Sequence, residues 1–225
     1  MISIKYKTLG AFDFDGVLAD TEPLHQRAKE ILAERLGVAK KPDYEASVGR
    51  PNRDFWLEVM ADNKISGIEV EILEKRQYEI ILEIAVERKL APTPGLEEAL
   101  KILSNPAVVL AVCSSSERWY LEKMLKILKL ADYFHFLVGG DEVARKKPAP
   151  DVYLRALELS GVPAENAFAV EDSKAGVEAA AGAGLFTIGY KNPGSGQQNL
   201  SKADLIIDSM PELNERFIKK CINLK

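Results

Sequence analysis

Polar residues suited to catalysis follow several short apolar runs of this chain, at the points where those runs end. In chain order they are Asp13 and Asp15, Ser114, Lys146 and Lys147, and Glu171 and Asp172. In a parallel α/β sheet, ligands bind outside the carboxyl ends of the strands. If the apolar runs are neighbouring strands, these side chains therefore gather at one edge of a sheet.

Four of these side chains are carboxylates, and like charges that share a site repel one another and raise each other's pKa. Asp13 and Asp15 are two residues apart, so on a strand both would point to the same face. A divalent cation would neutralise the cluster. Because the donors are all oxygen, with no His or Cys, the set favours Mg²⁺, which usually binds through few carboxylates together with a substrate phosphate. The predicted chemistry is phosphoryl transfer.

Each residue type has a role in such a reaction. We expect Asp13 to attack phosphorus and form an aspartyl-phosphate, which splits one difficult hydrolysis into two easier steps. Asp15 suits a general acid and base that protonates the leaving oxygen and then activates water. Ser114 would donate a hydrogen bond to a phosphoryl oxygen, and Lys147 would help Mg²⁺ to neutralise the phosphate.

The order of the elements predicts the fold that positions these residues. Apolar runs of strand length alternate with helical patterns, which is typical of a parallel sheet with right-handed crossovers. The runs are Leu9 to Phe14, Val108 to Cys113, Phe136 to Val138, Ala167 to Val170, Phe186 to Tyr190 and Leu205 to Ile207. The helical patterns are Leu96 to Leu103, Arg118 to Leu130, Asp151 to Leu159, Ser173 to Gly184 and Pro211 to Ile222. We predict an α/β fold with a doubly wound, Rossmann-like parallel sheet.

One interval, from about Thr21 to Ala91, breaks the alternation because it contains helical patterns and no convincing strand. These patterns are Leu24 to Leu36, Asp54 to Asn63 and Gly67 to Lys89. We therefore predict a catalytic core of residues 1–20 and 93–225 and an inserted all-helical cap of residues 21–92. Thr93 and Pro94 are expected to cap and open the next helix, and the two crossings are expected to act as a double hinge.

Composition excludes several classes of protein. The 225 residues are 47% hydrophobic and 28% charged, as in ordinary globular proteins. The net charge of −4 argues against nucleic acid as a partner, and no run reaches the roughly 18 apolar residues of a membrane span.

Residues 1–7 do not have the pattern of a secretory signal, so we expect a cytoplasmic protein, either a monomer or a weak homodimer. Cys113 and Cys221 lack the spacing of a disulfide framework or a zinc site and are expected to be buried apolar residues.

The ordered motifs resemble those of a known family. They are Asp13-Phe14-Asp15-Gly16-Val17-Leu18, then Ser114 after an apolar strand, Lys147-Pro148, and Glu171-Asp172-Ser173. This series is similar to the four motifs of the haloacid dehalogenase superfamily, with Lys146 as the alternative register for the third. The helical insert between the first and second motifs resembles the C1-capped, β-phosphoglucomutase-like phosphatases of that superfamily.

The resemblance implies a role for each acidic residue. Asp13 would be the nucleophile and a Mg²⁺ ligand. Asp15 would be the general acid and base, and would also lend its backbone carbonyl to the metal. Asp172 would be a further ligand, whereas Glu171 corresponds to a ligand in some members and to a neighbour of the ligands in others. Members that remove halide or cleave phosphonates lack the second aspartate, so Asp15 counts against both activities.

The expected activity is hydrolysis of a small phosphorylated metabolite, and the expected substrate class is a sugar phosphate. A β-phosphoglucomutase-type sugar phosphomutase is the alternative, and the intact acidic motifs argue against a non-catalytic binding protein. His25 matches a histidine of the mutases, whereas Asn52 stands where they have a phosphate-binding arginine. The candidate substrate-binding residues are His25, Gly49, Arg50, Asn52, Arg53, Ser115 and Ser116.

Two serines have a structural interpretation as well. Ser116 is expected to cap the helix that starts at Glu117, because serine is a good N-cap residue. Ser195 lies in Gly194-Ser195-Gly196, which lacks the lysine and the strand-to-helix context of a phosphate loop. That segment is expected to be a flexible surface loop.

Overall fold

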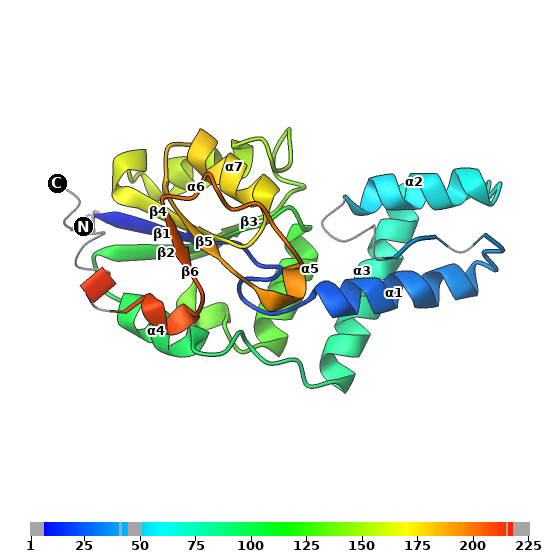
Figure 1. Ribbon diagram of the computed structural model, residues 1–225, viewed down its shortest axis with the longest axis horizontal. Helices are drawn as coiled ribbons and strands as arrows, with labels where there is room; N and C mark the ends of the chain where they lie inside the picture. The colour runs from blue at the N-terminus through cyan, green and yellow to red at the C-terminus, as the bar shows by residue number, and fades with distance from the viewer. Residues whose placement is uncertain (1–6, 41, 45–50, 215, 218–225) are drawn as a thin grey trace. The chain divides into compact units, whose positions relative to one another are not determined.

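The computed structural model describes residues 7–40, 42–44, 51–214 and 216–217, and the chain divides into two compact units. One unit comprises Met1–Asp20 and Ala91–Lys225, and the other comprises Thr21–Leu90 (Figure 1). Both boundaries fall where the sequence changes between alternating strands and helices and uninterrupted helical patterns.

The first unit is built on a six-stranded sheet in which every pair of neighbouring strands is parallel. The strands are β1 (Thr8–Phe12), β2 (Val108–Cys113), β3 (Phe136–Val138), β4 (Ala167–Glu171), β5 (Phe186–Tyr190) and β6 (Leu205–Ile207). Their order is β3-β2-β1-β4-β5-β6, so the chain winds outward from β1 in one direction and from β4 in the other. The predicted doubly wound fold is confirmed, and its switch point lies between β1 and β4.

Helices cover both faces of this sheet. They are α4 (Leu96–Leu103), α5 (Arg118–Ile127), α6 (Asp151–Ser160) and α7 (Lys174–Gly182). In Figure 1, α6 and α7 lie over one face and α4 and α5 over the other, as right-handed crossovers require. Strands β1, β2 and β4 are buried along their whole length, which explains why they read as continuous apolar runs. Cys113 is fully buried, as predicted, and Cys221 lies outside the described residues.

Two predicted helix starts differ from the structure. Helix α4 is capped by Gly95 rather than Thr93. Gly95 has a φ of 80°, a left-handed conformation that glycine adopts without strain.

The helix predicted from Pro211 begins later, because Met210–Glu212 forms a 3-10 helix. Asn214 Oδ1 accepts hydrogen bonds from the backbone N–H groups two and three residues further along, and residues 218–222 of the prediction lie outside the described residues.

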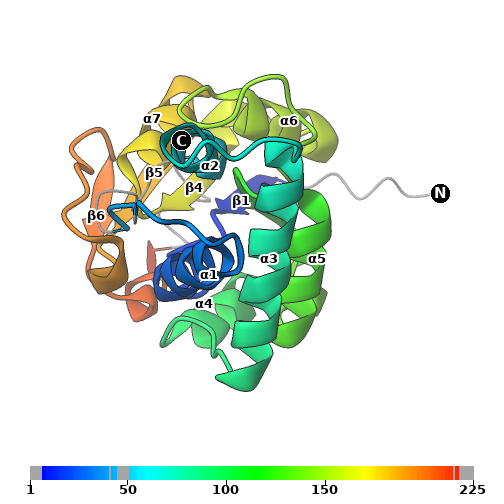
Figure 2. The same cartoon turned by 90° about the vertical axis from the view of Figure 1, so that its right-hand side faces the viewer.

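The second unit contains the helices α1 (Glu22–Arg35), α2 (Asn52–Asp62) and α3 (Val70–Glu87), and its described residues form no strand. Helix α3 packs against both α1 and α2, as Figure 2 shows. The apolar stripe of α1 is buried at Leu24, Ala28 and Leu32, so the helical periodicity read from the sequence corresponds to a packed face. None of the helices in the described part of the chain combines the length and the hydrophobicity of a membrane span.

Candidate active site

The register of the central strands brings their carboxyl ends to the same level. Phe12 at the end of β1 pairs with Val112 of β2 and with Val170 of β4. Asp13 follows directly, and its backbone N–H donates to the Val170 carbonyl at 3.0 Å. The residues that reach this edge from the neighbouring strands are Ser114, Glu171 and Asp172. The sheet therefore brings three of the four predicted motifs together at the switch point, where α/β sheets bind ligands.

Asp13, Glu171 and Asp172 form a buried carboxylate cluster. One oxygen from each lies within 4.8 Å of the others. Burial, together with the charge of Glu171, raises the pKa of Asp13 well above its usual range, although Lys147 opposes the shift. Burial also raises the pKa of Asp172 to about 7, against a hydrogen bond from Ser195 that lowers it. Ionisation of both Asp13 and Asp172 at this buried site is therefore costly without a cation.

Lys147 supplies a positive charge to this carboxylate cluster. Its Nζ lies 2.7 Å from Asp13 Oδ1 and 2.5 Å from Glu171 Oε1 and donates to the Cys113 carbonyl at 2.7 Å. Burial lowers the pKa of Lys147, but the charges of Asp13 and Glu171 outweigh it, so the pKa of Lys147 is raised. Lys146 is exposed, so Lys147 is the member of the lysine pair that reaches the cluster.

Asp15 is not one of the three members of the carboxylate cluster, although its charge acts on Asp13 and Asp172. Strand β1 ends at Phe12, so strand alternation does not extend to Asp15, and the common direction expected for the Asp13 and Asp15 carboxylates stays a prediction. Ser116 Oγ donates to Asp15 Oδ2 at 2.8 Å. The predicted capping role of Ser116 is also wrong, because its hydroxyl is directed to this carboxylate. A carboxylate outside the cluster suits proton transfer better than metal ligation.

The serines after β2 differ in their surroundings. Ser114 is buried, and its Oγ accepts a hydrogen bond from the backbone N–H of Ser116 at 3.1 Å. Because that oxygen acts as an acceptor, the Ser114 hydroxyl hydrogen can be donated to a ligand. Ser115 is half-buried. Its carbonyl lies so close to Gly140 that a Cβ there would come within 2.2 Å of the Ser115 oxygen.

A further serine at the site is one that the sequence analysis assigned to the surface. Ser195 is buried, and its Oγ donates to Asp172 Oδ2 in a short hydrogen bond. The same Oγ accepts from Asn192 Nδ2 at 2.8 Å, and Asn192 Oδ1 accepts from Gly194 N. The predicted flexible surface loop is therefore wrong for Ser195. This loop follows the carboxyl end of β5, so the rule that located the other motifs would also have found it.

Tyr153 is the second residue that the sequence analysis missed. Its side chain is fully buried on α6, and its hydroxyl donates to Glu171 Oε1 in a short hydrogen bond. Burial, and then the charge of Glu171, raises the pKa of the Tyr153 phenol well above its usual range, so the hydroxyl remains a donor. In the sequence, Tyr153 is one more apolar position of an amphipathic helix, and nothing local distinguishes it.

The carboxylate cluster fits a divalent cation. Glu171 Oε2 is buried and has no hydrogen-bond partner among the described residues, which is unfavourable for a carboxylate unless another group satisfies it. The backbone at Gly16 lies close to Asp172, and the backbone at Gly176 lies close to Glu171. A Cβ on Gly16 would lie 1.8 Å from Asp172 Oδ2, and a Cβ on Gly176 would lie 1.8 Å from Glu171 Oε2. Buried, all-oxygen ligands are those that Mg²⁺ prefers.

The predicted substrate residues of the helical unit have different surroundings. Gln77 Nε2 contacts His25 Nδ1 at 3.2 Å and Asn52 Oδ1 at 3.1 Å, so His25 and Asn52 belong to one buried hydrogen-bond network. Arg53 is exposed and forms an ion pair with Glu71 at 2.5 Å. Gly49 and Arg50 lie outside the described residues.

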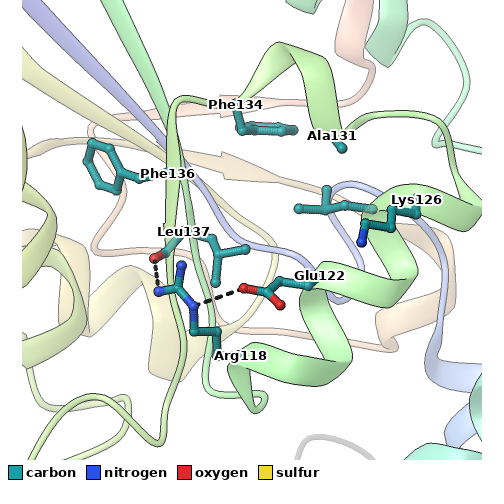
Figure 3. A pocket seen from close by; sticks show the side chains of 8 residues that line it. Arg118, Glu122, Lys126, Ala131, Phe134, Phe136 and Leu137 are labelled. Carbon is teal, nitrogen blue, oxygen red and sulfur yellow. Dashed lines mark hydrogen bonds and ion pairs between the residues drawn. The ribbon is translucent and has the colours of Figure 1, made fainter.

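A separate hollow of about 180 Å³ lies between α5 and the edge strand β3 (Figure 3). Its lining consists of Arg118, Glu122, Leu125, Lys126, Ala131, Phe134, Phe136 and Leu137. The Arg118 guanidinium donates to Glu122, to Glu142 and to the Leu137 carbonyl. None of the residues of the carboxylate cluster lines this hollow.

Comparison with known proteins agrees with this arrangement. Residues 11–190 match the family model of the haloacid dehalogenase-like hydrolases. A "Phosphorylated carbohydrates phosphatase" of Thermotoga maritima is 37% identical over 175 residues, which cover 77% of this chain and 80% of the relative. A "Beta-phosphoglucomutase" of Bacillus subtilis is 30% identical over 213 residues, which cover 90% of this chain and 89% of the relative.

A solved structure is similar as well. The crystal structure of CbbY from Rhodobacter sphaeroides in complex with phosphate superposes with a TM-score of 0.84 at 29% identity, covering 92% of this chain and 96% of that one. The family match includes Asp13 and Asp15, Ser114, Lys147, and Glu171 and Asp172. The chain is therefore a member of the haloacid dehalogenase-like hydrolase family and an enzyme of the hydrolase class.

Proposed function

We propose that the protein is a Mg²⁺-dependent phosphatase that hydrolyses a small phosphorylated metabolite, and that this metabolite is a sugar phosphate. The observation that carries the proposal is the buried cluster of Asp13, Glu171 and Asp172 around the Lys147 ammonium. The names of its relatives, a phosphatase of phosphorylated carbohydrates and a sugar phosphomutase, support the substrate class. The helical unit would select the substrate.

The reaction takes two steps on the residues of this chain. In the first, an Asp13 carboxylate oxygen forms a bond to phosphorus and the bond from phosphorus to the sugar oxygen breaks, while Asp15 donates its proton to that leaving oxygen. In the second, Asp15 takes a proton from water, the water oxygen bonds to phosphorus, and the Asp13–phosphorus bond breaks. Lys147 and the Ser114 hydroxyl stabilise the negative charge of the phosphoryl group in both steps.

Asp13, Asp172 and Glu171 are the side chains that would hold the metal. When bound, Mg²⁺ neutralises negative charge on the phosphoryl group and on the carboxylates around it. The unpartnered Glu171 Oε2 supports this assignment. Because Asp15 is held by Ser116 outside the carboxylate cluster, its side chain remains a proton carrier.

The alternative function is a phosphomutase, in which a sugar hydroxyl replaces water in the second step. The Bacillus subtilis relative and the match of His25 to a histidine of the mutases favour it, whereas Asn52 in place of the mutase arginine counts against it. The test begins with phosphate release from a panel of phosphorylated metabolites, sugars first. Incubation with β-glucose 1-phosphate and a trace of its bisphosphate then separates the two functions, because a mutase produces glucose 6-phosphate and a hydrolase produces free phosphate.

Mg²⁺ affinity is expected to depend on pH through the carboxylate cluster. The pKa of Asp172 is raised to about 7 in the metal-free fold, so this aspartate is mostly protonated at pH 6 and mostly ionised at pH 8. Because a metal ligand must be deprotonated, apparent Mg²⁺ affinity should rise roughly tenfold between these pH values. Calorimetric titration with Mg²⁺ at both pH values measures the change.

The raised pKa of Asp172 also determines how the stability of the metal-free protein changes with pH. An aspartate whose pKa is higher in the folded than in the unfolded state binds more protons when folded, so the metal-free protein loses stability as pH rises through about 7. Mg²⁺ should therefore increase the melting temperature more at pH 8 than at pH 6. An equal increase at the two pH values would contradict the assignment of Asp172 as a ligand.

Ser195→Ala is expected to weaken Mg²⁺ binding. The substitution removes the hydroxyl that orients Asp172, and loss of such an orienting partner typically costs roughly 10- to 100-fold in metal affinity. The Mg²⁺ concentration for half-maximal activity should rise by this factor, with activity largely recovered at saturating Mg²⁺. Ser201→Ala is the matched control, because Ser201 is an exposed serine of the same C-terminal region. An unchanged Mg²⁺ dependence of the Ser195 variant would refute the orienting role.

A further inference from the structure

The two oxygens of the buried Glu171 carboxylate have different surroundings. Oε1 accepts a hydrogen bond from Lys147 Nζ at 2.5 Å and another from the Tyr153 hydroxyl. Oε2 is buried as well, and among the described residues it has no hydrogen-bond partner. A carboxylate oxygen has about two lone pairs, so the two donors use Oε1 fully, whereas the lone pairs of Oε2 are available.

The fold keeps both donors against Oε1. Lys147 Nζ also lies 2.7 Å from Asp13 Oδ1. Tyr153 is fully buried on α6, and Lys147 Nζ lies 5.1 Å from the centroid of its ring, within the range of a cation–π interaction. The backbone of α7 is close on another side, since a Cβ on Gly176 would lie 2.3 Å from Glu171 Oε1. The carboxylate therefore cannot turn Oε1 away from its donors without displacing buried groups.

The other two carboxylates of the cluster are less restricted. Among the described residues, Asp13 Oδ1 accepts from Lys147 and Asp172 Oδ2 accepts from Ser195, which is one donor for each oxygen. Each of these oxygens keeps a lone pair that a cation can use. Glu171 Oε1 differs because it has a second donor, the Tyr153 hydroxyl. Lys147 alone would leave it one lone pair.

An oxygen that is closed to metal ions affects the choice between Mg²⁺ and Ca²⁺. Mg²⁺ requires octahedral geometry and usually binds through few carboxylates and several waters, whereas Ca²⁺ takes roughly six to eight oxygens and often both oxygens of one carboxylate. A carboxylate binds an ion through both oxygens only if each has a lone pair to offer. Because Glu171 can offer Oε2 alone, the site suits Mg²⁺ better than Ca²⁺.

We propose that Tyr153 is a positioning residue that closes Glu171 Oε1 to metal ions and thereby makes the site select Mg²⁺ over Ca²⁺. The inference rests on the Mg²⁺ dependence of the proposed function. Both ions are hard divalent cations that prefer oxygen ligands, so the charge of the cluster does not separate them. The number of oxygens that the cluster can offer does.

Tyr153→Phe tests this role, because it removes the hydroxyl and keeps the ring beside Lys147. Mg²⁺ affinity should fall roughly tenfold, since loss of a group that orients a ligand typically costs about 10- to 100-fold. Ca²⁺ affinity should not fall, because Ca²⁺ gains Glu171 Oε1 as a ligand. The ratio of the Mg²⁺ to the Ca²⁺ association constant should therefore fall roughly tenfold. Calorimetric titration of the metal-free protein with MgCl₂ and with CaCl₂ at pH 8 measures both constants.

The ratio distinguishes this role from a structural one. A structural defect would weaken the binding of both ions equally, and an unchanged ratio in the Tyr153 variant would overturn the proposal. Tighter binding of Ca²⁺ than of Mg²⁺ by the wild-type protein would overturn it as well. Tyr133→Phe is the matched control, because it removes the hydroxyl of a half-buried tyrosine of the same unit, on the 3-10 helix Ala131–Tyr133. This control should bind both ions like the wild-type protein.

A crystal structure of the wild-type protein grown with Mg²⁺ tests the same assignment without a variant. We expect Glu171 to face the ion through Oε2 alone, while Oε1 stays within hydrogen-bond distance of Lys147 Nζ and the Tyr153 hydroxyl. Contact between Oε1 and the ion would overturn the proposal.

The proposal and the proposed function can fail separately, because the titrations contain no substrate. If the wild-type protein binds both ions but releases phosphate from no ester, the phosphatase function is overturned and the ratio still tests Tyr153. If the wild-type protein hydrolyses esters and the ratio is unchanged in the Tyr153 variant, only the role of Tyr153 is overturned.

Discussion

Asp13→Asn is expected to abolish phosphatase activity while leaving the protein folded. An amide does not attack phosphorus, and loss of a catalytic nucleophile costs on the order of 10⁴-fold or more in kcat. Asparagine keeps the shape of the side chain, and its carbonyl oxygen can still accept from Lys147, which lies 2.7 Å from Asp13 Oδ1. Phosphate release from p-nitrophenyl phosphate, followed to long times, measures the loss.

The stability of this variant gives an independent check. Asp13 has a pKa raised by burial and by Glu171, so replacing it with a neutral residue removes a repelling charge from the carboxylate cluster. The melting temperature without metal should be equal to or higher than that of the wild-type protein at pH 8. Asp132→Asn is the control, because Asp132 is exposed on the 3-10 helix Ala131–Tyr133 and should change neither quantity. Retention of most activity by the Asp13 variant would exclude Asp13 as the nucleophile.

Lys147→Met is expected to impair both stability and catalysis. Methionine approximates the buried stem of the lysine but leaves Asp13 and Glu171 without the ammonium that lies 2.7 and 2.5 Å from them. Removing one partner of a buried ion pair typically costs about 3–5 kcal/mol. Because about 1 kcal/mol shifts the melting temperature of a chain of this size by roughly 2–4 °C, thermal unfolding without metal measures the effect.

Catalysis should decrease in the Lys147 variant because a donor to the phosphoryl group is lost, which typically costs about 10²- to 10³-fold in kcat. The stability loss should shrink as pH falls, since burial raises the pKa of Asp13 and its protonation removes one of the charges left unpaired. Lys146→Met is the matched control, because Lys146 is the exposed neighbour in the chain and should behave like the wild-type protein. Equal effects of the two substitutions would contradict the role assigned to Lys147.

Much of the fold could be predicted because its signals are local. Strands buried on both faces are continuous apolar runs, so the segments that became β2, β3 and β5 were located with their observed ends. Helix starts were harder to predict, because a left-handed glycine at Gly95 and a side-chain cap at Asn214 compete with simple periodicity.

The candidate site was predictable where its residues follow strands directly. Asp13, Ser114 and Glu171 are placed by the strand before each of them, so parallel pairing alone brings them to one edge. Tyr153 and Ser195 are placed by helix packing and by a folded loop. Their contacts to Glu171 and Asp172 span 18 and 23 residues. The strand-end rule points to the loop of Ser195 but not to its hydrogen bond with Asp172, and nothing local distinguishes Tyr153.

The sequence by itself determined the parallel α/β architecture, the helical insert and the identity of the acidic, serine and lysine motifs, because each depends on residues close together in the chain. Only the tertiary structure decided that the Ser116 hydroxyl donates a hydrogen bond to the Asp15 carboxylate and that Lys147, not Lys146, contacts Asp13. The same is true of the hydrogen bonds that join Gln77 to His25 and Asn52. In each case side chains of similar type compete for the same contact, and the outcome depends on differences of a few ångströms between segments far apart in the sequence. Such distances are set by the packing of whole helices and strands rather than by local pattern.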